Sequence, residues 1–179
     1  GTRWKVALAL LVVMSQAILE RNAITFSASI SACAKSAEWQ GALALLTAMD
    51  LVVLERSSIG HNSAITACVQ GLQWQRALTL LSTMSQLVLE PSTISYSAAI
   101  SACEKSSEWQ RAVDLLAAMS HAAVEASTTS YNAVIAACKT GAEWQTAVVL
   151  LAAMNLVTLK PDAISFGATI DACEKSAGL

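Results

Sequence analysis

Apolar residues along this chain recur at the spacing of an α-helix. Phe26, Ile30 and Cys33 lie four and three residues apart, so they share one helix face. A short polar link follows, and a second helical stripe of apolar residues then runs from Trp39 to Met49. The pattern predicts a hairpin of two short helices, called helix A and helix B below, joined by a tight turn.

The hairpin pattern recurs along the whole chain with a fixed step of 35 residues and no insertion. Four residue types keep the step: tryptophan (Trp4, Trp39, Trp74, Trp109, Trp144), methionine (Met14, Met49, Met84, Met119, Met154), cysteine (Cys33, Cys68, Cys103, Cys138, Cys173) and alanine (Ala7, Ala42, Ala77, Ala112, Ala147). A single hairpin cannot bury its apolar stripes, so neighbouring hairpins must stack into a continuous core. The sequence therefore predicts an all-α fold, an α-solenoid of stacked two-helix repeats.

The 35-residue step divides the chain into complete and partial repeats. The complete repeats span residues 23–57, 58–92, 93–127 and 128–162. Residues 1–22 hold helix B and the loop of a truncated repeat, and residues 163–179 hold helix A of another. Neither end shows a polar capping helix, so we expect a segment of a longer array.

Composition agrees with a packed domain rather than a disordered or membrane-spanning chain. Of the 179 residues, 55% are hydrophobic and 13% are charged, with a net charge of −2. The longest apolar stretch, Val6 to Leu19, is broken by Ser15 and Gln16 and is shorter than a membrane span requires. We expect no membrane partner and see no signal peptide in this segment.

The side chains that usually carry catalysis or bind metals are sparse. The five cysteines occur without a Cys-x-x-Cys pair, and the histidines are His61 and His121 alone. Equivalent cysteines in stacked repeats should lie about 10 Å apart, set by helix packing, which is beyond disulfide reach. We expect buried free thiols, no metal site, no cofactor and no enzymatic activity in this segment.

Short motifs repeat inside each unit. Helix A opens with an aromatic fourth residue in Ala23–Ser27, Thr93–Ser97 and Thr128–Asn132, helix B reads Ala-x-x-Leu-Leu-x-x-Met, and two loops read Leu-Glu-Pro-Ser (89–92) and Leu-Lys-Pro-Asp (159–162). Over its whole length the chain resembles the pentatricopeptide repeat family. The tetratricopeptide repeat has a 34-residue period and a tryptophan in its first helix, whereas here the tryptophan opens helix B.

The resemblance implies sequence-specific binding of single-stranded RNA, one base per repeat, along a right-handed superhelix. In this family the second residue of each repeat wedges beside a base, and the fifth and thirty-fifth residues read its edge. The wedge row would be Ile24, Ile59, Ile94, Thr129 and Ile164. The reading pairs would be Ser27 with Ser57, Asn62 with Ser92, Ser97 with Ser127, and Asn132 with Asp162. The family's code then suggests the RNA sequence A-C-A-U, and DNA is not an expected partner.

Each of these rows also has a simpler structural interpretation. The residues Asn22, Ser57, Ser92, Ser127 and Asp162, which precede the A helices, are good N-caps, and capping alone would select them. The isoleucine row could belong to the core. Lys35, Lys105 and Lys175 could contact phosphate or simply be solvated, and Gln70 and Thr140 interrupt their row, with Lys139 one place early.

Some features argue against tight RNA binding. His61 replaces the aromatic residue of its repeat, Gly167 offers no reading group, and the net charge is acidic whereas nucleic-acid binders are usually basic. A protein-interaction scaffold that uses the concave face is therefore an alternative, and an array without a ligand is a third. If RNA is the partner, we expect weak binding by this segment, as part of a longer factor in the chloroplast or mitochondrion that serves RNA processing, editing, stability or translation.

Overall fold

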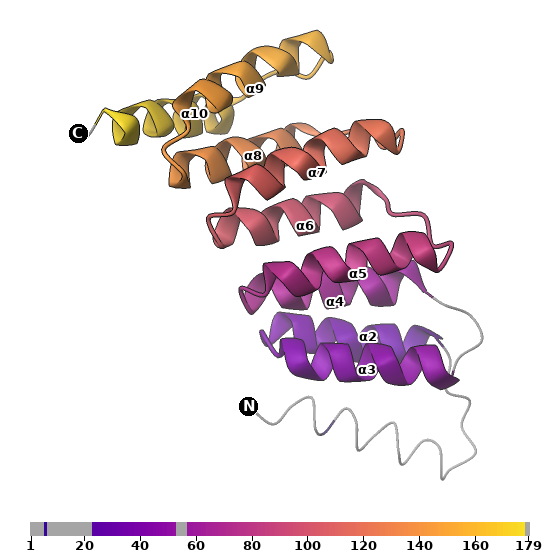
Figure 1. Ribbon diagram of the computed structural model, residues 1–179. Helices are drawn as coiled ribbons and strands as arrows, with labels where there is room; N and C mark the ends of the chain where they lie inside the picture. The colour runs from indigo at the N-terminus through magenta and orange to yellow at the C-terminus, as the bar shows by residue number, and fades with distance from the viewer. Residues whose placement is uncertain (1–5, 7–22, 53–56, 178–179) are drawn as a thin grey trace. The chain divides into compact units, whose positions relative to one another are not determined.

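The computed structural model describes residue 6 and residues 23–52 and 57–177, and the described residues form helices and turns without a strand. The helices are α2 (Ala23–Lys35), α3 (Trp39–Val52), α4 (Ser58–Gln70), α5 (Trp74–Gln86), α6 (Thr93–Lys105), α7 (Trp109–His121), α8 (Thr128–Thr140), α9 (Trp144–Leu156) and α10 (Ala163–Ser176) (Figure 1). The predicted all-α fold is confirmed. The predicted truncated repeat at residues 1–22 lies, except for Val6, outside the described residues.

Each predicted helix A pairs with the helix B that follows it. The even-numbered helices are A helices, and α3, α5, α7 and α9 are B helices. The chain divides after Pro91 into two compact units, which are described separately here. In the first unit α2 packs on α3 and α4, and α4 packs on α5. In the second unit α6, α8 and α10 stack in order, and α7 and α9 each pack between two A helices. This is the hairpin stacking of an α-solenoid.

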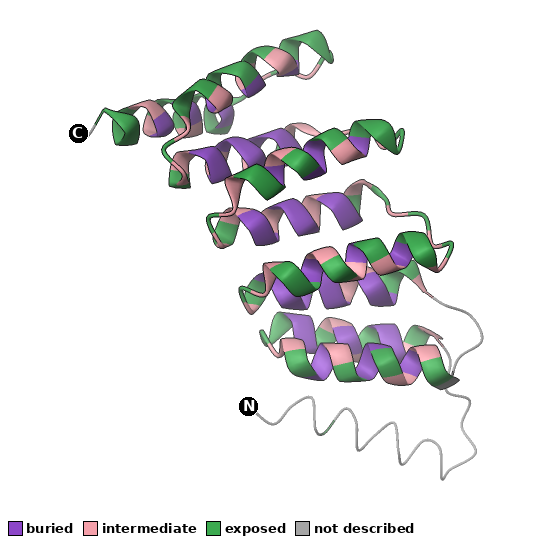
Figure 2. Cartoon of the chain, viewed as in Figure 1, coloured by how far each residue is buried: buried purple, intermediate pink, exposed green. Residues whose placement is uncertain are grey.

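The residue rows that keep the 35-residue step form the core. The buried rows are Ala42, Ala77, Ala112 and Ala147, then Met49, Met84, Met119 and Met154, and, within the A helices, Ile30, Ile65, Ile100 and Ile135 (Figure 2). Alanine in the first of these rows leaves room for a neighbouring helix to approach. The tryptophan row differs from the prediction, because Trp39, Trp74 and Trp109 are half-buried and Trp144 is exposed. These indoles cover the edge of the core rather than filling it.

The turns between helices use a left-handed residue that is not glycine. Ala37, Leu72, Ser107 and Ala142 have φ between 56° and 61°, and each is the second residue after the end of an A helix. At the first of these turns, the N–H of Glu38 donates to the carbonyl of Cys33 at 3.0 Å. That bond is part of the Schellman pattern, which satisfies carbonyl groups at the helix end. The left-handed conformation costs on the order of 1–2 kcal/mol for such a residue, so packing on both sides must hold the turn.

Two glycines at the ends of A helices let a tryptophan approach the backbone. A Cβ atom added at Gly71 would lie 2.3 Å from Cδ1 of Trp39, and one at Gly141 would lie 2.3 Å from Cδ1 of Trp109. Both glycines have φ near −85°, so close packing and not backbone conformation requires them. Arg76 adds a cation–π contact, with its guanidinium carbon 4.8 Å from the Trp39 ring centroid.

We predict opposite effects for two glycine-to-alanine substitutions. Gly141→Ala should lower the free energy of unfolding by about 1–3 kcal/mol, because its methyl group overlaps Trp109. Gly167→Ala, in a helix where an added Cβ meets nothing within 4 Å, should raise stability by about 0.5–1 kcal/mol. Urea unfolding followed by circular dichroism measures both. Equal midpoints for the two variants would contradict the packing described here.

Candidate nucleic-acid interface

The second residue of each A helix projects away from the core. Ile24, Ile59, Ile94 and Ile164 are 65–76% exposed, and Thr129 is exposed as well. In α2, α4, α6 and α8 they stand two residues before a buried aromatic residue or histidine, whereas the equivalent Phe166 of α10 is exposed. The alternative that the isoleucine row is ordinary core is therefore wrong. Exposing a row of large apolar side chains is unfavourable unless something covers it.

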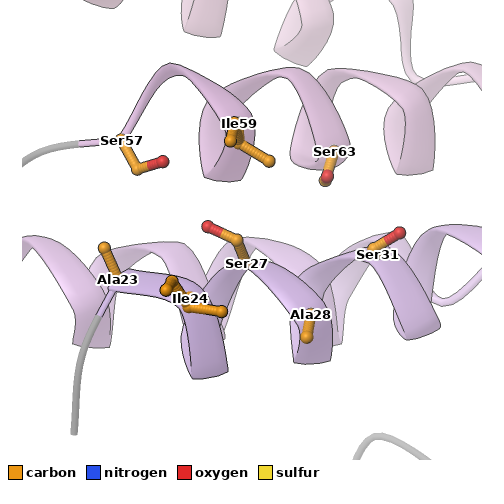
Figure 3. Close-up of a pocket in the computed structure, with 8 residues that line it drawn as sticks. All are labelled: Ala23, Ile24, Ser27, Ala28, Ser31, Ser57, Ile59 and Ser63. Carbon is orange, nitrogen blue, oxygen red and sulfur yellow. The ribbon is translucent and has the colours of Figure 1, made fainter.

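In the first unit this row borders a pocket between α2 and α4. The pocket has a volume of about 350 Å³, and its lining consists of Ala23, Ile24, Ser27, Ala28, Ser31, Ser57, Ile59 and Ser63 (Figure 3). Two predicted wedge residues and the first predicted reading pair thus line one cavity. The Ser27 hydroxyl, on α2, points towards α4 (Figure 3). The pocket combines apolar walls with several hydroxyl groups.

Ser27 is the most unusual polar group in this pocket. Its side chain is 7% exposed, and its Oγ has no hydrogen-bond partner among the described residues. Leaving a buried hydroxyl without a partner costs about 1–3 kcal/mol. A ligand that offers a donor or acceptor in the pocket would recover this energy, so the cavity is suited to a partly polar, partly flat group.

In the second unit, the last predicted reading pair is joined by a direct hydrogen bond. Nδ2 of Asn132 donates to Oδ1 of Asp162 at 3.1 Å. Asn132 is buried on α8, whereas Asp162 is exposed at the start of α10. Hydrogen bonds from the backbone N–H of Ser165 and then from the Asn132 amide lower the pKa of the Asp162 carboxyl. Asp162 therefore stays ionised at neutral pH and holds one end of the Asn132 amide.

The thirty-fifth residues cap helices to different degrees. Ser127 and Asp162 accept from the backbone N–H groups of Ser130 and Ser165, at 3.1 and 2.9 Å. Ser57 also stands at an N-cap position, but its side chain makes no capping bond, so the expectation that capping explains the whole row is wrong there. Asn22 lies outside the described residues.

The remaining reading residues fall in both units. Asn62 is half-buried on α4 in the first unit, and Ser92 is exposed before α6 in the second. The N–H of Ser92 donates to Oγ of Ser95 at 3.1 Å. Ser97 is half-buried on α6 and hydrogen-bonds Ser130.

The lysines at the ends of the A helices are exposed, whereas Lys139 is paired with an acidic residue. Lys35, Lys105 and Lys175 are exposed in the last turns of α2, α6 and α10, so phosphate contact stays a prediction. Asp171 forms an ion pair with Lys139. Lys139 is the lysine that stands one place early relative to Lys35, Lys105 and Lys175, and this ion pair engages its side chain.

His61 occupies the position of the aromatic residue without exposing its ring. It is fully buried on α4, and its Nδ1 lies 3.2 Å from the carbonyl oxygen of Ser57. Phe26, Tyr96 and Tyr131 are buried at the equivalent position. His61 is thus a core residue and does not weaken the exposed row.

Sequence reasoning missed the third position of each A helix. Thr25 occupies it in α2, Gly60 in α4, and Ser95, Ser130 and Ser165 in α6, α8 and α10. The 35-residue recurrence of serine could have identified these positions, but they resemble ordinary helix-start residues. Their contacts to reading residues of the preceding repeat appear in the structure alone.

Comparison with known proteins agrees with this geometry. A family model described as the PPR repeat matches residues 94–122. No curated protein sequence matches the chain. The crystal structure of the pentatricopeptide repeat protein PPR10 in complex with an 18-nt psaJ RNA element matches with a TM-score of 0.82 and 18% identity, over 96% of this chain and 25% of that chain. The structure of PPR10 from maize matches with a TM-score of 0.61 and 16% identity, over 97% of this chain and 35% of that chain.

The fold and the repeated site together define a helical-repeat solenoid. One repeat of this chain matches the family model, and the chain shares the helical-repeat fold of the matched pentatricopeptide repeat structures. The chain spans about a quarter to a third of the length of the matched structures.

The described residues offer no other obvious chemistry. They contain no group of three or more histidine, cysteine, aspartate or glutamate side chains arranged to hold a metal ion. No helix among them is long and apolar enough to cross a membrane. All five cysteines are free, with Cys173 the most accessible.

We predict that cysteine reactivity follows burial. Desolvation raises the pKa of Cys68, Cys103 and Cys138 from 9.0 to about 11, so iodoacetamide at pH 8 should label Cys173 first. The folded state keeps protons that the unfolded chain loses, so the free energy of unfolding should fall as pH rises from about 9 to about 11. Peptide mass spectrometry after timed labelling tests the order. Labelling of Cys103 as fast as Cys173 would contradict it.

Proposed function

We propose that this chain binds single-stranded RNA, with one base contacting each repeat along the exposed starts of the A helices. The observation that supports this most directly is the pocket between α2 and α4, where Ile24 and Ile59 border a cavity that also contains Ser27 and Ser57. Apolar side chains beside a base face and polar groups at its edge are what recognition of an unstacked base requires.

The proposed roles follow from exposure and hydrogen-bonding capacity. The wedge row, Ile24, Ile59, Ile94, Thr129 and Ile164, contacts base faces, since these side chains are exposed. The reading pairs supply hydroxyl, amide and carboxylate groups to base edges. Asn132 keeps one N–H and one carbonyl lone pair beyond its contacts with Asp162 and Ser165. Adjacent donor and acceptor groups match the edge of uracil, the base that the pair is expected to read.

The expected affinity of this segment is low. Stacking contributes on the order of 1–3 kcal/mol per base, and the entropy lost on association must be subtracted. Four reading pairs then leave roughly millimolar to micromolar binding. The acidic net charge of −2 adds no general attraction to phosphate, and Lys35, Lys105 and Lys175 are the proposed local contacts.

The proposal extends to the longer protein that such a segment would belong to. PPR10, whose structure includes an RNA element, is about four times as long as the part this chain matches. We propose that the full protein binds an organellar transcript in the chloroplast or mitochondrion, and that this segment contributes binding rather than catalysis.

We predict that Ile59→Ala weakens RNA binding by about five-fold. The substitution removes three apolar carbons at the pocket border, where a bound base would cover them only in part. A five-fold loss corresponds to about 1 kcal/mol, close to the contribution of one methylene group withdrawn from water. Fluorescence anisotropy with a labelled single-stranded RNA containing A-C-A-U, at low salt, measures the change. The control is Leu51→Ala, which removes another exposed apolar side chain, from α3 and outside the pocket.

The two variants distinguish the possible outcomes. Weaker binding by Ile59→Ala alone supports the interface. Equal effects of both substitutions would indicate non-specific apolar contact. If the unaltered chain binds no strand, RNA binding is rejected and the protein-scaffold alternative takes its place.

A further inference from the structure

The third residue of α10 connects both members of the reading pair before it. Oγ of Ser165 lies 2.6 Å from Oδ1 of Asn132 and 3.0 Å from Oδ1 of Asp162, and it accepts from the N–H of Asp162 at 3.1 Å. Oδ1 of Asp162 already accepts from the Ser165 N–H and the Asn132 amide. The Ser165 hydroxyl has a single proton, and it therefore donates to the carbonyl oxygen of Asn132, which is also the closer of the two oxygens.

These contacts permit one orientation of the Asn132 amide. With Nδ2 towards the Asp162 carboxylate and Oδ1 towards the Ser165 hydroxyl, each group meets a complementary partner. A flipped amide would place its carbonyl oxygen against the carboxylate, which is repulsive. Ser165 itself is fully buried, so it shapes the pair without being exposed to a ligand.

Ser130 makes the equivalent contacts one repeat earlier. Its Oγ lies 2.9 Å from Oγ of Ser97 and 3.0 Å from Oγ of Ser127, and it accepts from the N–H of Ser127 at 3.3 Å. Ser130 is also fully buried. The third-position serine thus contacts both reading residues in two consecutive repeats.

The pocket between α2 and α4 provides a comparison, because the third residue of α4 is Gly60 instead of serine. A Cβ atom at Gly60 would lie 3.5 Å from Oγ of Ser27, so a side chain here would face the same reading position. Without it, Ser27 Oγ is buried without a partner, and Ser57 makes no capping bond. The loss of the third-position hydroxyl and the loss of these contacts coincide.

We propose that the third residue of each A helix is a positioning residue for base recognition, which fixes the hydrogen-bonding state of the reading pair in the preceding repeat. Ser130 and Ser165 fix their pairs, whereas Gly60 leaves Ser27 free to rotate. The pocket between α2 and α4 therefore discriminates among bases less than the pair of Asn132 and Asp162. This inference rests on the proposed RNA binding, but the positioning itself is measurable without RNA.

The first test compares Ser165→Ala with Ser165→Thr in the 179-residue chain. Anisotropy is measured with four RNAs, A-C-A-U and the three strands that change its last base. Ser165→Ala should reduce the preference for uracil by about three- to ten-fold, the effect of one hydrogen bond, and Ser165→Thr should restore it. A merely structural role would weaken binding of all four strands equally, and that result would overturn the proposal.

The second test needs no RNA. Removing the Ser165 hydroxyl should release the Asn132 amide, whose Nδ2 then donates less well to Asp162. The pKa of the Asp162 carboxyl should therefore rise part of the way to its ordinary value, since the backbone N–H of Ser165 remains. The substitution should also shift the side-chain amide signals of Asn132. Carbon-detected NMR across a pH titration reads both. An unchanged pKa and unchanged amide signals would overturn the positioning role, even if RNA binding fails altogether.

The third test introduces the missing hydroxyl. Gly60→Ser and Gly60→Ala both place a Cβ atom 2.9 Å from the flexible end of Met49, so their difference isolates the hydroxyl. Gly60→Ser should increase discrimination at the first base by about three-fold or more over Gly60→Ala. Identical discrimination by the two variants would contradict the proposal, whereas failure of every form to bind RNA would count against the proposed function instead.

Discussion

Burial of apolar stripes between neighbouring hairpins is the constraint on which the rest of this structure depends. The isoleucine, alanine and methionine rows become core because the next repeat covers them, and a single hairpin has no other way to remove them from water. The identical 35-residue step keeps every stripe in register with the next. The same packing holds strained left-handed residues such as Ala37 and Ala142 in the turns, and it brings Trp39 and Trp109 against glycine backbones.

Stacking also positions polar groups that are far apart in the sequence. Because α8 and α10 pack side by side, a residue at the fifth position of one repeat meets the third position of the next, as Asn132 meets Ser165. The isoleucines beside these groups remain exposed. Within each unit the surface therefore carries exposed apolar side chains beside polar groups, which is the arrangement that the proposed RNA binding requires.

Much of this could be predicted from the sequence, because a fixed period carries the same information several times. The hairpins and the buried alanine and methionine rows follow from the spacing, whereas the reading residues come from the resemblance and stay a prediction. Contacts between repeats were harder to predict, since the hydrogen bond between Ser97 and Ser130 and the ion pair between Lys139 and Asp171 join residues more than thirty positions apart. The exposure of the wedge row and the partial burial of the tryptophans depend on how the helices rotate as they pack, which apolar spacing does not determine.

The central claim, that bases lie against the exposed isoleucine row, is tested most directly by methyl NMR of the isoleucines during titration with single-stranded RNA. Each A helix before α10 contains a buried isoleucine six residues after its wedge position, at Ile30, Ile65, Ile100 and Ile135, which provides an internal control. The account predicts ring-current shifts for Ile24, Ile59 and Ile94, with little change in the buried row. Shifts that are absent from the exposed row, or that are as large in the buried row as in the exposed one, would contradict it.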